Sequence, residues 1–258
     1  MLMVQVIYEI TWACPCKCPF CTVPKSSFNY VVPTTEYEKV LRLFKRYFRC
    51  DLAVVISGGE PSIVPNLRDY VDIARGLGYE VTIVTNGYNA GNVLRAEPDL
   101  IEVSIDYFGE SHDKVRGVEG LFSRAMGLVF RASMRGIPVV VRSTAMRGNI
   151  DDLLKMREYM DGNGLRDVPI LVMPVRGSPE LKPSKQQLLE LVRRDGIYIS
   201  NNCPAGISSF VVTPEREVLA CIFYRKKLGR LRRITKRELD KVVVEGAKIP
   251  RYPCENPT

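Results

Sequence analysis

Short apolar runs rich in β-branched residues alternate with stretches of helical periodicity through the first two thirds of the chain. The apolar runs predict strands at residues 4–10, 52–57, 80–85, 100–104, 139–144 and 168–173. The stretches between them predict helices at residues 35–48, 66–77, 89–96, 119–134 and 150–163. Such βα repeats predict a parallel sheet with right-handed crossovers. Six units are too few for the usual eight-fold barrel, so the expected class is α/β, a partial (β/α)6 TIM-like barrel.

The pattern changes after Met173. Pro174, Gly177, Pro179 and Pro183 mark a linker, and a helix is predicted at residues 184–194. The segment SSFVVTPEREVLAC then predicts a β-hairpin with its turn at residues 213–216. We therefore expect two parts, a barrel core at residues 1–175 and a small C-terminal extension at residues 176–258. In the core, chemistry is expected at the carboxyl ends of the strands.

The composition indicates the class of protein and the cellular compartment in which it is expected. Hydrophobic residues make up 46% of the 258 residues and charged residues 26%, which is ordinary for a folded protein. No long uncharged apolar run exists, and the start MLMVQVIYEI lacks the features of a signal peptide. A cytoplasmic protein with no membrane partner is expected. Eight cysteines in such a protein favour metal ligands or reactive thiols over disulfides, although a hyperthermophile's cytosol is an exception.

The net charge of +8 arises mainly late in the chain, at residues 225–241. One interpretation is a solvated helix face whose acidic partners, Glu238 and Asp240, are nearby. The other is a patch for an acidic partner such as a nucleic acid or an acidic peptide. No aromatic residues are interleaved with the charges to stack on bases, so the first interpretation is favoured and nucleic-acid binding is not expected.

The strongest chemical signal is Cys14-x3-Cys18-x2-Cys21, directly after the first predicted strand. Three thiolates at this spacing can hold one face of a cubane [4Fe–4S] cluster and leave its fourth iron without a protein ligand. A three-cysteine zinc site is the alternative. Cys16 lies inside the motif but outside its pattern, and is interpreted as a spectator thiol.

The segment ITWACPCKCPFC resembles the opening motif of the radical S-adenosylmethionine (SAM) superfamily. The resemblance implies that the open iron takes the amino and carboxylate groups of SAM. One electron then cleaves a carbon–sulfur bond, giving methionine and a 5′-deoxyadenosyl radical. Phe20 matches the aromatic position that the family places against adenine.

Further motifs of the family follow at the predicted strand ends. The run Ser57-Gly-Gly-Glu-Pro matches the element that holds the SAM amino group, which implies roles for Gly58, Gly59 and Glu60. Its glycines would let backbone groups approach a ligand. The resemblance implies further SAM contacts at the ends of the third and fourth strands, together with a candidate catalytic residue that orients substrate or the deoxyadenosyl sugar: Thr85, Asn86 and Ser104 as contacts, and Asp106 as the candidate catalytic residue.

The run His112-Asp113-x2-Arg116-Gly117 is similar to one in anaerobic sulfatase-maturating and peptide-modifying members of the superfamily. That similarity implies that Arg116 pairs with the SAM carboxylate, which suits a bidentate guanidinium. His112 is assigned a capping role, and Arg142 is a weaker candidate for a SAM contact.

Three later cysteines, Cys203, Cys221 and Cys254, resemble the SPASM or twitch extensions that bind auxiliary [4Fe–4S] clusters. Three cysteines are too few for two clusters, so one twitch-like cluster is expected. Its fourth ligand is left open between a non-cysteine residue, Cys16, Cys50 and the substrate itself. A zinc knot or buried inert thiols are the alternatives. The turn glycine of the family is replaced by Arg216.

Taken together, the motifs predict a radical SAM oxidoreductase that receives electrons from a small ferredoxin- or flavodoxin-type protein. By resemblance, the substrate is a peptide or protein side chain that becomes oxidised or crosslinked. Three alternatives remain: action on a small molecule or nucleoside, activation of a glycyl-radical enzyme, and a zinc-bound basic module that binds nucleic acid.

Overall fold

The computed structural model describes residues 3–24, 30–176, 178–200 and 203–250. A curved sheet forms its centre, and seven of its strands run parallel in chain order. These strands are β1 (Val4–Thr11), β2 (Leu52–Gly58), β3 (Glu80–Thr85), β4 (Leu100–Ser104), β5 (Val139–Ala145), β6 (Ile170–Pro174) and β7 (Ile197–Ile199). The sheet does not close on itself in the described chain, because β7 and β10 (Lys227–Arg230) are its two edges. The predicted partial barrel is confirmed.

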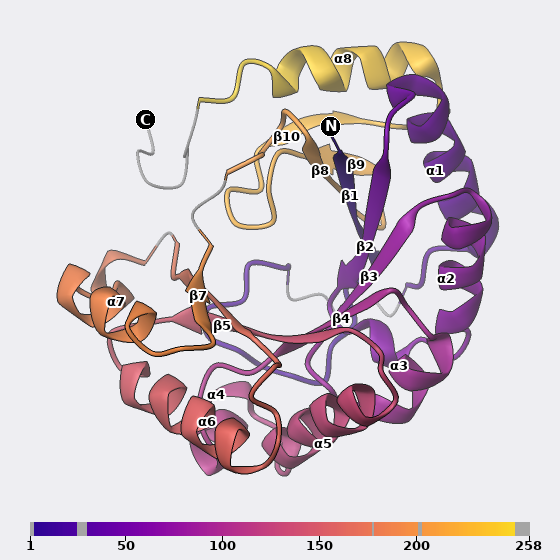
Figure 1. Ribbon diagram of the computed structural model, residues 1–258. Coiled ribbons are helices and arrows are strands. Elements are labelled where there is room, and N and C mark those ends of the chain that lie inside the picture. Colours follow the sequence, from indigo (N-terminus) through magenta and orange to yellow (C-terminus); the bar gives the residue numbers. More distant parts are fainter. Residues whose placement is uncertain (1–2, 25–29, 177, 201–202, 251–258) are drawn as a thin grey trace.

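Helices cover the outer face of this sheet (Figure 1). They are α1 (Thr34–Phe48), α2 (Leu67–Gly76), α3 (Ala90–Ala96), α4 (Glu110–Arg116), α5 (Leu121–Met134), α6 (Ile150–Gly162) and α7 (Lys185–Val192). The side chains of β1 alternate as a strand between two environments requires. Val6, Tyr8 and Ile10 are buried in the core that includes Tyr37 and Val40 of α1. The intervening residues face the inside of the barrel, where chemistry can take place.

The sequence reading missed several elements. The strand β7 has only three residues and α4 only seven, so neither provides enough residues for a periodic pattern. The strand β10 was also missed, and α8 (Lys236–Gly246) was suggested only as a charged helix face. The strand predicted from residue 168 begins at Ile170 in the structure.

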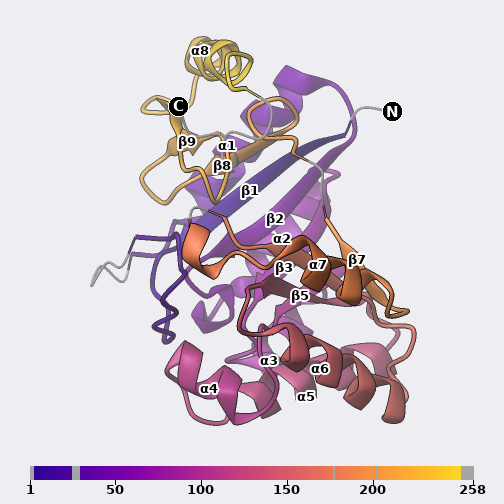
Figure 2. The ribbon, with the colours of Figure 1, turned by 90° about the vertical axis from the view of Figure 1, so that its left-hand side faces the viewer.

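The C-terminal extension is hydrogen-bonded to the barrel. The predicted hairpin forms from β8 (Ser209–Val212) and β9 (Glu217–Leu219), and β8 pairs in parallel with β1. Strands β8 to β10 of the extension therefore continue the barrel sheet on the far side of β1, beneath α8 (Figure 2), whereas β7 pairs with β6 at the other edge. The boundary near residue 175 stays a prediction.

Arg216 occupies the hairpin turn with φ +62°, in the left-handed region that glycine adopts most easily. Its guanidinium lies 3.3 Å from the Glu36 carboxylate at the start of α1. The turn geometry expected of the family glycine is thus present without the glycine.

No helix in the described part of the chain is long and apolar enough to cross a membrane.

Candidate functional site

A cavity of about 160 Å³ lies at the carboxyl ends of β1 to β4. All four cysteines of the loop after β1 line it, including Cys16. The other residues predicted from the sequence that line it come from five separate segments: Phe20, Gly58, Gly59, Glu60, Thr85, Asn86, Ser104 and Arg116. The fold therefore brings the predicted cluster ligands and most of the predicted SAM contacts to one place.

The two glycines at the end of β2 hold the cysteine loop. The Gly59 N–H donates to the Thr11 carbonyl at 2.7 Å, and the Glu60 N–H donates to the Ala13 carbonyl at 2.9 Å. A Cβ on Gly59 would lie 2.2 Å from the Ala13 carbonyl oxygen, far inside van der Waals contact. The sequence argument expected these glycines to admit a ligand, whereas in the structure they admit the backbone that begins the cysteine loop.

The Glu60 carboxylate is 1% exposed and links two strand ends. It accepts hydrogen bonds from the Ser62 N–H at 2.9 Å, the Thr85 hydroxyl at 2.5 Å and the Asn86 N–H at 2.7 Å. Burial raises the pKa of Glu60, and these hydrogen bonds oppose that rise. An ionised carboxylate offers about four acceptor positions, so one remains for an ammonium group.

Asn86 extends this link to the sulfur atoms. Its side-chain amide donates to Cys16 Sγ at 3.1 Å and lies 3.7 Å from Cys14 Sγ. The Cys16 thiol is in hydrogen-bonding reach of both Cys14 and Cys18, which lowers the pKa of each. The pKa of Cys18 falls to about 7, because of Cys16 first and the charge of Arg116 second. The thiolate is the form that binds metal, so this environment favours ligation.

Arg116 is held beside the cysteine loop by a buried ion pair. Its Nη2 lies 2.5 Å from Asp106 Oδ2, and Asp106 Oδ1 accepts from the Thr144 N–H at 2.8 Å. The Arg116 carbonyl accepts from the Lys17 N–H at 2.8 Å. Burial lowers the pKa of Arg116, but Asp106 outweighs it and leaves that pKa above its usual value. Asp106 lines neither this cavity nor the second one in the described chain, so its placement favours orienting Arg116 over touching substrate.

His112 is fully buried, and its Nδ1 accepts from the Asp106 N–H at 3.3 Å. Burial lowers the pKa of His112 to about 4, so the ring is neutral near pH 7. The ring therefore fixes the Asp106 backbone, which agrees in kind with the capping role assigned from the sequence.

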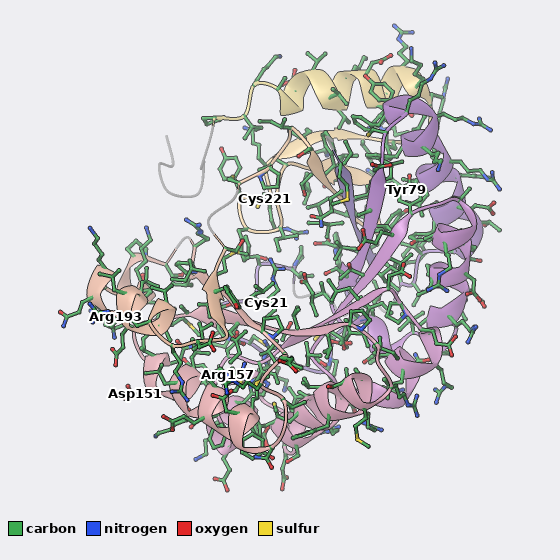
Figure 3. All side chains as sticks on the ribbon, in the orientation of Figure 1. Cys21, Tyr79, Asp151, Arg157, Arg193 and Cys221 are labelled. Carbon is green, nitrogen blue, oxygen red and sulfur yellow. The ribbon has the colours of Figure 1, made fainter. Side chains whose placement is uncertain are left out.

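A second cavity, of about 270 Å³, lies inside the barrel against the C-terminal extension. Cys203 and Cys221 both line it, and Cys221, like Cys21, lies within the ring of strands in Figure 3. Arg142 lines this cavity rather than the first one, and its Nη1 lies 2.6 Å from Glu102 Oε2. Arg142 pairs in register with Ser104 of β4, so these two neighbouring predicted SAM contacts line different cavities.

Three other cysteines were considered from the sequence as further ligands of a C-terminal cluster. Cys254 lies outside the described residues. Cys16 lines the first cavity, and Cys50 packs against the hydrophobic core beyond the end of α1. Neither Cys16 nor Cys50 is therefore placed as the fourth ligand of a C-terminal cluster.

The sequence reading missed one connection between the two cavities. Arg225 makes a two-pronged contact with the Glu9 carboxylate, at 2.6 Å and 3.1 Å, and Glu9 is 1% exposed. The Trp12 indole N–H donates to the same carboxylate at 2.7 Å. Trp12 immediately precedes the cysteine loop and Arg225 follows Cys221, so one carboxylate joins both cysteine-bearing segments. The only sequence signal was an acidic residue in a largely apolar strand.

The residues fit an iron–sulfur cluster better than a single ion. In the described chain, no three Cys, His, Asp or Glu side chains converge as ligands of one metal ion. The cysteine sulfurs instead line a cavity, as expected for thiolates that bind different irons of a cluster.

The family model of the radical SAM superfamily matches residues 8–160, which run from β1 into α6 and include the cysteine loop. The chain belongs to the radical SAM superfamily. Enzymes of this superfamily carry a [4Fe–4S] cluster and bind SAM, and the first cavity gathers thiols and polar groups suited to both.

Curated relatives of this radical SAM protein are identical to it at about a quarter of the aligned positions. The sporulation killing factor maturation protein SkfB of Bacillus subtilis is 26% identical over 174 residues, covering 63% of this chain and 41% of SkfB. The PqqA peptide cyclase of Ruegeria pomeroyi is 26% identical over 184 residues, covering 67% of this chain and 48% of the cyclase. The pre-heme d1 synthase of Dinoroseobacter shibae is 29% identical over 167 residues, covering 62% and 41%. The chain thus spans less than half the length of these relatives.

Solved structures agree on the fold. Native anSMEcpe with bound AdoMet and Cp18Cys peptide superimposes with a TM-score of 0.72 at 14% identity, covering 98% of this chain and 86% of that one. At this identity the likeness shows a shared fold, which is that of a radical SAM partial barrel with its extension.

Replacing Gly59 by alanine should displace the cysteine loop. The added methyl group would overlap the Ala13 carbonyl, and overpacking of this kind costs about 1 to 3 kcal/mol. We expect Gly59→Ala to bind about four fewer irons per chain than the wild type after anaerobic reconstitution, because a cubane cluster holds four and only the N-terminal site is disturbed. Gly148→Ala is the matched control, because a Cβ there meets nothing within 4 Å. Full iron content in Gly59→Ala would show that the contact is not needed.

Replacing Arg225 by methionine should leave the Glu9 carboxylate buried without its cation. Loss of one partner of a buried pair costs about 3 kcal/mol. We expect a lower urea midpoint for Arg225→Met and altered emission from Trp12, the only tryptophan of the chain. The control Lys227→Met breaks the exposed pair with Glu217 and should cost less than about 1 kcal/mol. Equal midpoints for the two variants would contradict the link.

Proposed function

We propose that this chain reductively cleaves SAM and uses the resulting radical to oxidise or crosslink a peptide or protein side chain, with one auxiliary cluster near its C-terminus. The observation that carries the proposal is the first cavity. There, residues from the cysteine loop after β1, from the ends of β2, β3 and β4, and from α4 meet around one space. Each strand end contributes the type of group that binding of a cluster or of SAM requires.

The residues of the first cavity divide into two roles. Cys14, Cys18 and Cys21 would hold the cluster, which when bound supplies the electron that splits a carbon–sulfur bond of SAM. Glu60 has one acceptor position left for the SAM ammonium group. Arg116 is a permanent cation that would pair with the SAM carboxylate. Because the partners of Glu60 and Arg116 fix them before SAM arrives, little reorganisation accompanies binding.

The remaining cavity-lining residues and the second cavity complete the proposal. Phe20 would contact adenine, and Ser104 would contact the ribose or carboxylate of SAM. Cys203 and Cys221 face one space inside the barrel and would hold the auxiliary cluster together with Cys254. Residues 1–175 would then form the SAM-cleaving core, and residues 176–258 the extension that carries the second cluster.

A peptide or protein substrate is supported by the names of the relatives. They include a sporulation killing factor maturation protein and a PqqA peptide cyclase, and anSMEcpe was solved with a bound peptide. The pre-heme d1 synthase keeps action on a small molecule as the second candidate.

Iron and sulfide per chain test the two-cluster arrangement after anaerobic reconstitution. The wild type should bind about eight irons, and a Cys203/Cys221/Cys254→Ala variant about four, since each cubane holds four. Cys50→Ala, which alters a thiol packed against the core, should keep the wild-type content. The wild type and the Cys203/Cys221/Cys254→Ala variant should both release 5′-deoxyadenosine from SAM with dithionite, whereas Cys14/Cys18/Cys21→Ala should release none. Four irons in both the wild type and the Cys203/Cys221/Cys254→Ala variant would refute the auxiliary cluster. Bound zinc without iron would refute the whole assignment.

A basic hollow supports an acidic electron donor of the ferredoxin or flavodoxin type. Six cations line it, from α1 and from two turns of the extension: Lys39, Arg42, Arg46, Arg216, Arg232 and Arg233. In the described chain, no carboxylate forms an ion pair with the side chains of Lys39, Arg46 or Arg232, so their charges are available to a partner. The described lining contains no aromatic side chain, so the hollow gives no support to base stacking.

Charge reversal tests this surface. We expect Arg46→Glu/Arg232→Glu to slow flavodoxin-driven release of 5′-deoxyadenosine about tenfold at low ionic strength, because steering by opposite charge is lost. The rate with dithionite should not change. The control Arg135→Glu/Lys155→Glu makes the same charge change just after α5 and on α6, and should leave both rates unchanged. Equal slowing in both variants would mean that net charge, not this hollow, governs the reaction with the donor.

A further inference from the structure

Cys16 lies among the predicted cluster ligands although the cysteine motif skips it. It lines the same cavity as Cys14, Cys18 and Cys21, and its thiol is in hydrogen-bonding reach of Cys14 and Cys18. A thiol that merely occupied a loop position could point to solvent, as the exposed Cys14 and Cys21 show that this loop allows. The structure instead directs it to the other sulfur atoms.

Cys16 also faces the side of the cavity assigned to SAM. The Asn86 amide donates to Cys16 Sγ at 3.1 Å, while the Asn86 backbone N–H donates to the Glu60 carboxylate at 2.7 Å. One residue thus spans the distance between the Cys16 sulfur and the carboxylate proposed to receive the SAM ammonium group. Cys16 is positioned where the protein ligands end and the SAM groups begin.

We propose that Cys16 is a displaceable fourth thiolate ligand of the N-terminal cluster. It binds the iron that the three motif cysteines leave open, and SAM displaces it. This inference rests on the proposed function, since it needs a cluster at this site. A fourth thiolate is chemically suited to the role, because soft sulfur ligands select iron–sulfur clusters.

The exchange is a substitution of ligands without a change of oxidation state. The bond between iron and Cys16 sulfur would break, and the released thiolate would take the proton that the SAM ammonium group loses. The SAM amino nitrogen and a carboxylate oxygen would bind the same iron in its place. In the absence of SAM, Cys16 would keep the cluster fully ligated and protect it from loss of that iron.

The test uses the Cys203/Cys221/Cys254→Ala protein as background, so that all bound iron belongs to the N-terminal site. Cys16→Ala and Cys16→Ser are compared with the background, and Cys50→Ala is the control for loss of a thiol elsewhere. Without SAM, ferricyanide should convert the cluster of Cys16→Ala to the three-iron form about fivefold faster than that of the background, followed by its electron paramagnetic resonance signal. With saturating SAM the two rates should be equal.

Binding of SAM provides a second readout. If Cys16 occupies the iron in about four fifths of the background protein, removing it should lower the apparent Kd for SAM about fivefold. The Cys16→Ser protein should give intermediate values, because a hydroxyl is a weaker ligand for a soft metal site. The Cys50→Ala control should match the background in both measurements.

Three outcomes would overturn the inference. Equal conversion rates and equal Kd values in the background and Cys16→Ala would show that Cys16 does not bind the iron. Loss of iron in both Cys16 variants would make it a required ligand instead of a displaceable one. A background protein that takes up no cluster would refute the proposed function and this inference with it, whereas the first two outcomes leave that function intact.

Discussion

The site depends on one close approach between two segments of backbone. The end of β2 lies so near the start of the cysteine loop that Gly59 has no room for a side chain, and two hydrogen bonds join the segments there. Since this contact positions the loop relative to the sheet, it also positions every thiol relative to the polar groups of the next strands. Glu60 is the next residue, and its carboxylate accepts hydrogen bonds from the end of β3. The same segment therefore also positions β3 relative to the cysteine loop.

Buried carboxylates then serve as connectors. Glu60 joins β2 to β3, Asp106 joins Arg116 to β5, and Glu9 joins β1 to the segment after Cys221. A buried carboxylate is costly unless each oxygen has a partner, so each of these groups specifies its neighbours strictly. The result is a rigid set of anchors around a loop whose own cysteines are partly exposed. Rigid surroundings and an accessible loop suit a site that must be loaded with a cluster after folding.

The sequence predicted most of this framework because its signals are local. Apolar runs located the six principal strands, and motif order placed Cys14, Glu60 and Arg116 at one end of the sheet. What it could not supply were partners distant in sequence. Glu9 and Arg225 are 216 residues apart, and only the pairing of β8 with β1 brings them together. The contact between Gly59 and the cysteine loop could not be predicted for the same reason, since its neighbour is another part of the chain.

The pairing of β8 with β1 also has a consequence for biosynthesis. Until residues 209–212 have left the ribosome, β1 is an edge strand with one row of unpaired amide and carbonyl groups. The nascent barrel would therefore expose an unpaired strand edge, which can pair with other chains, for most of the time that translation takes. A chaperone that covers this edge during synthesis would prevent wrong pairing. Detaching the extension to obtain a minimal catalytic core would make the hazard permanent.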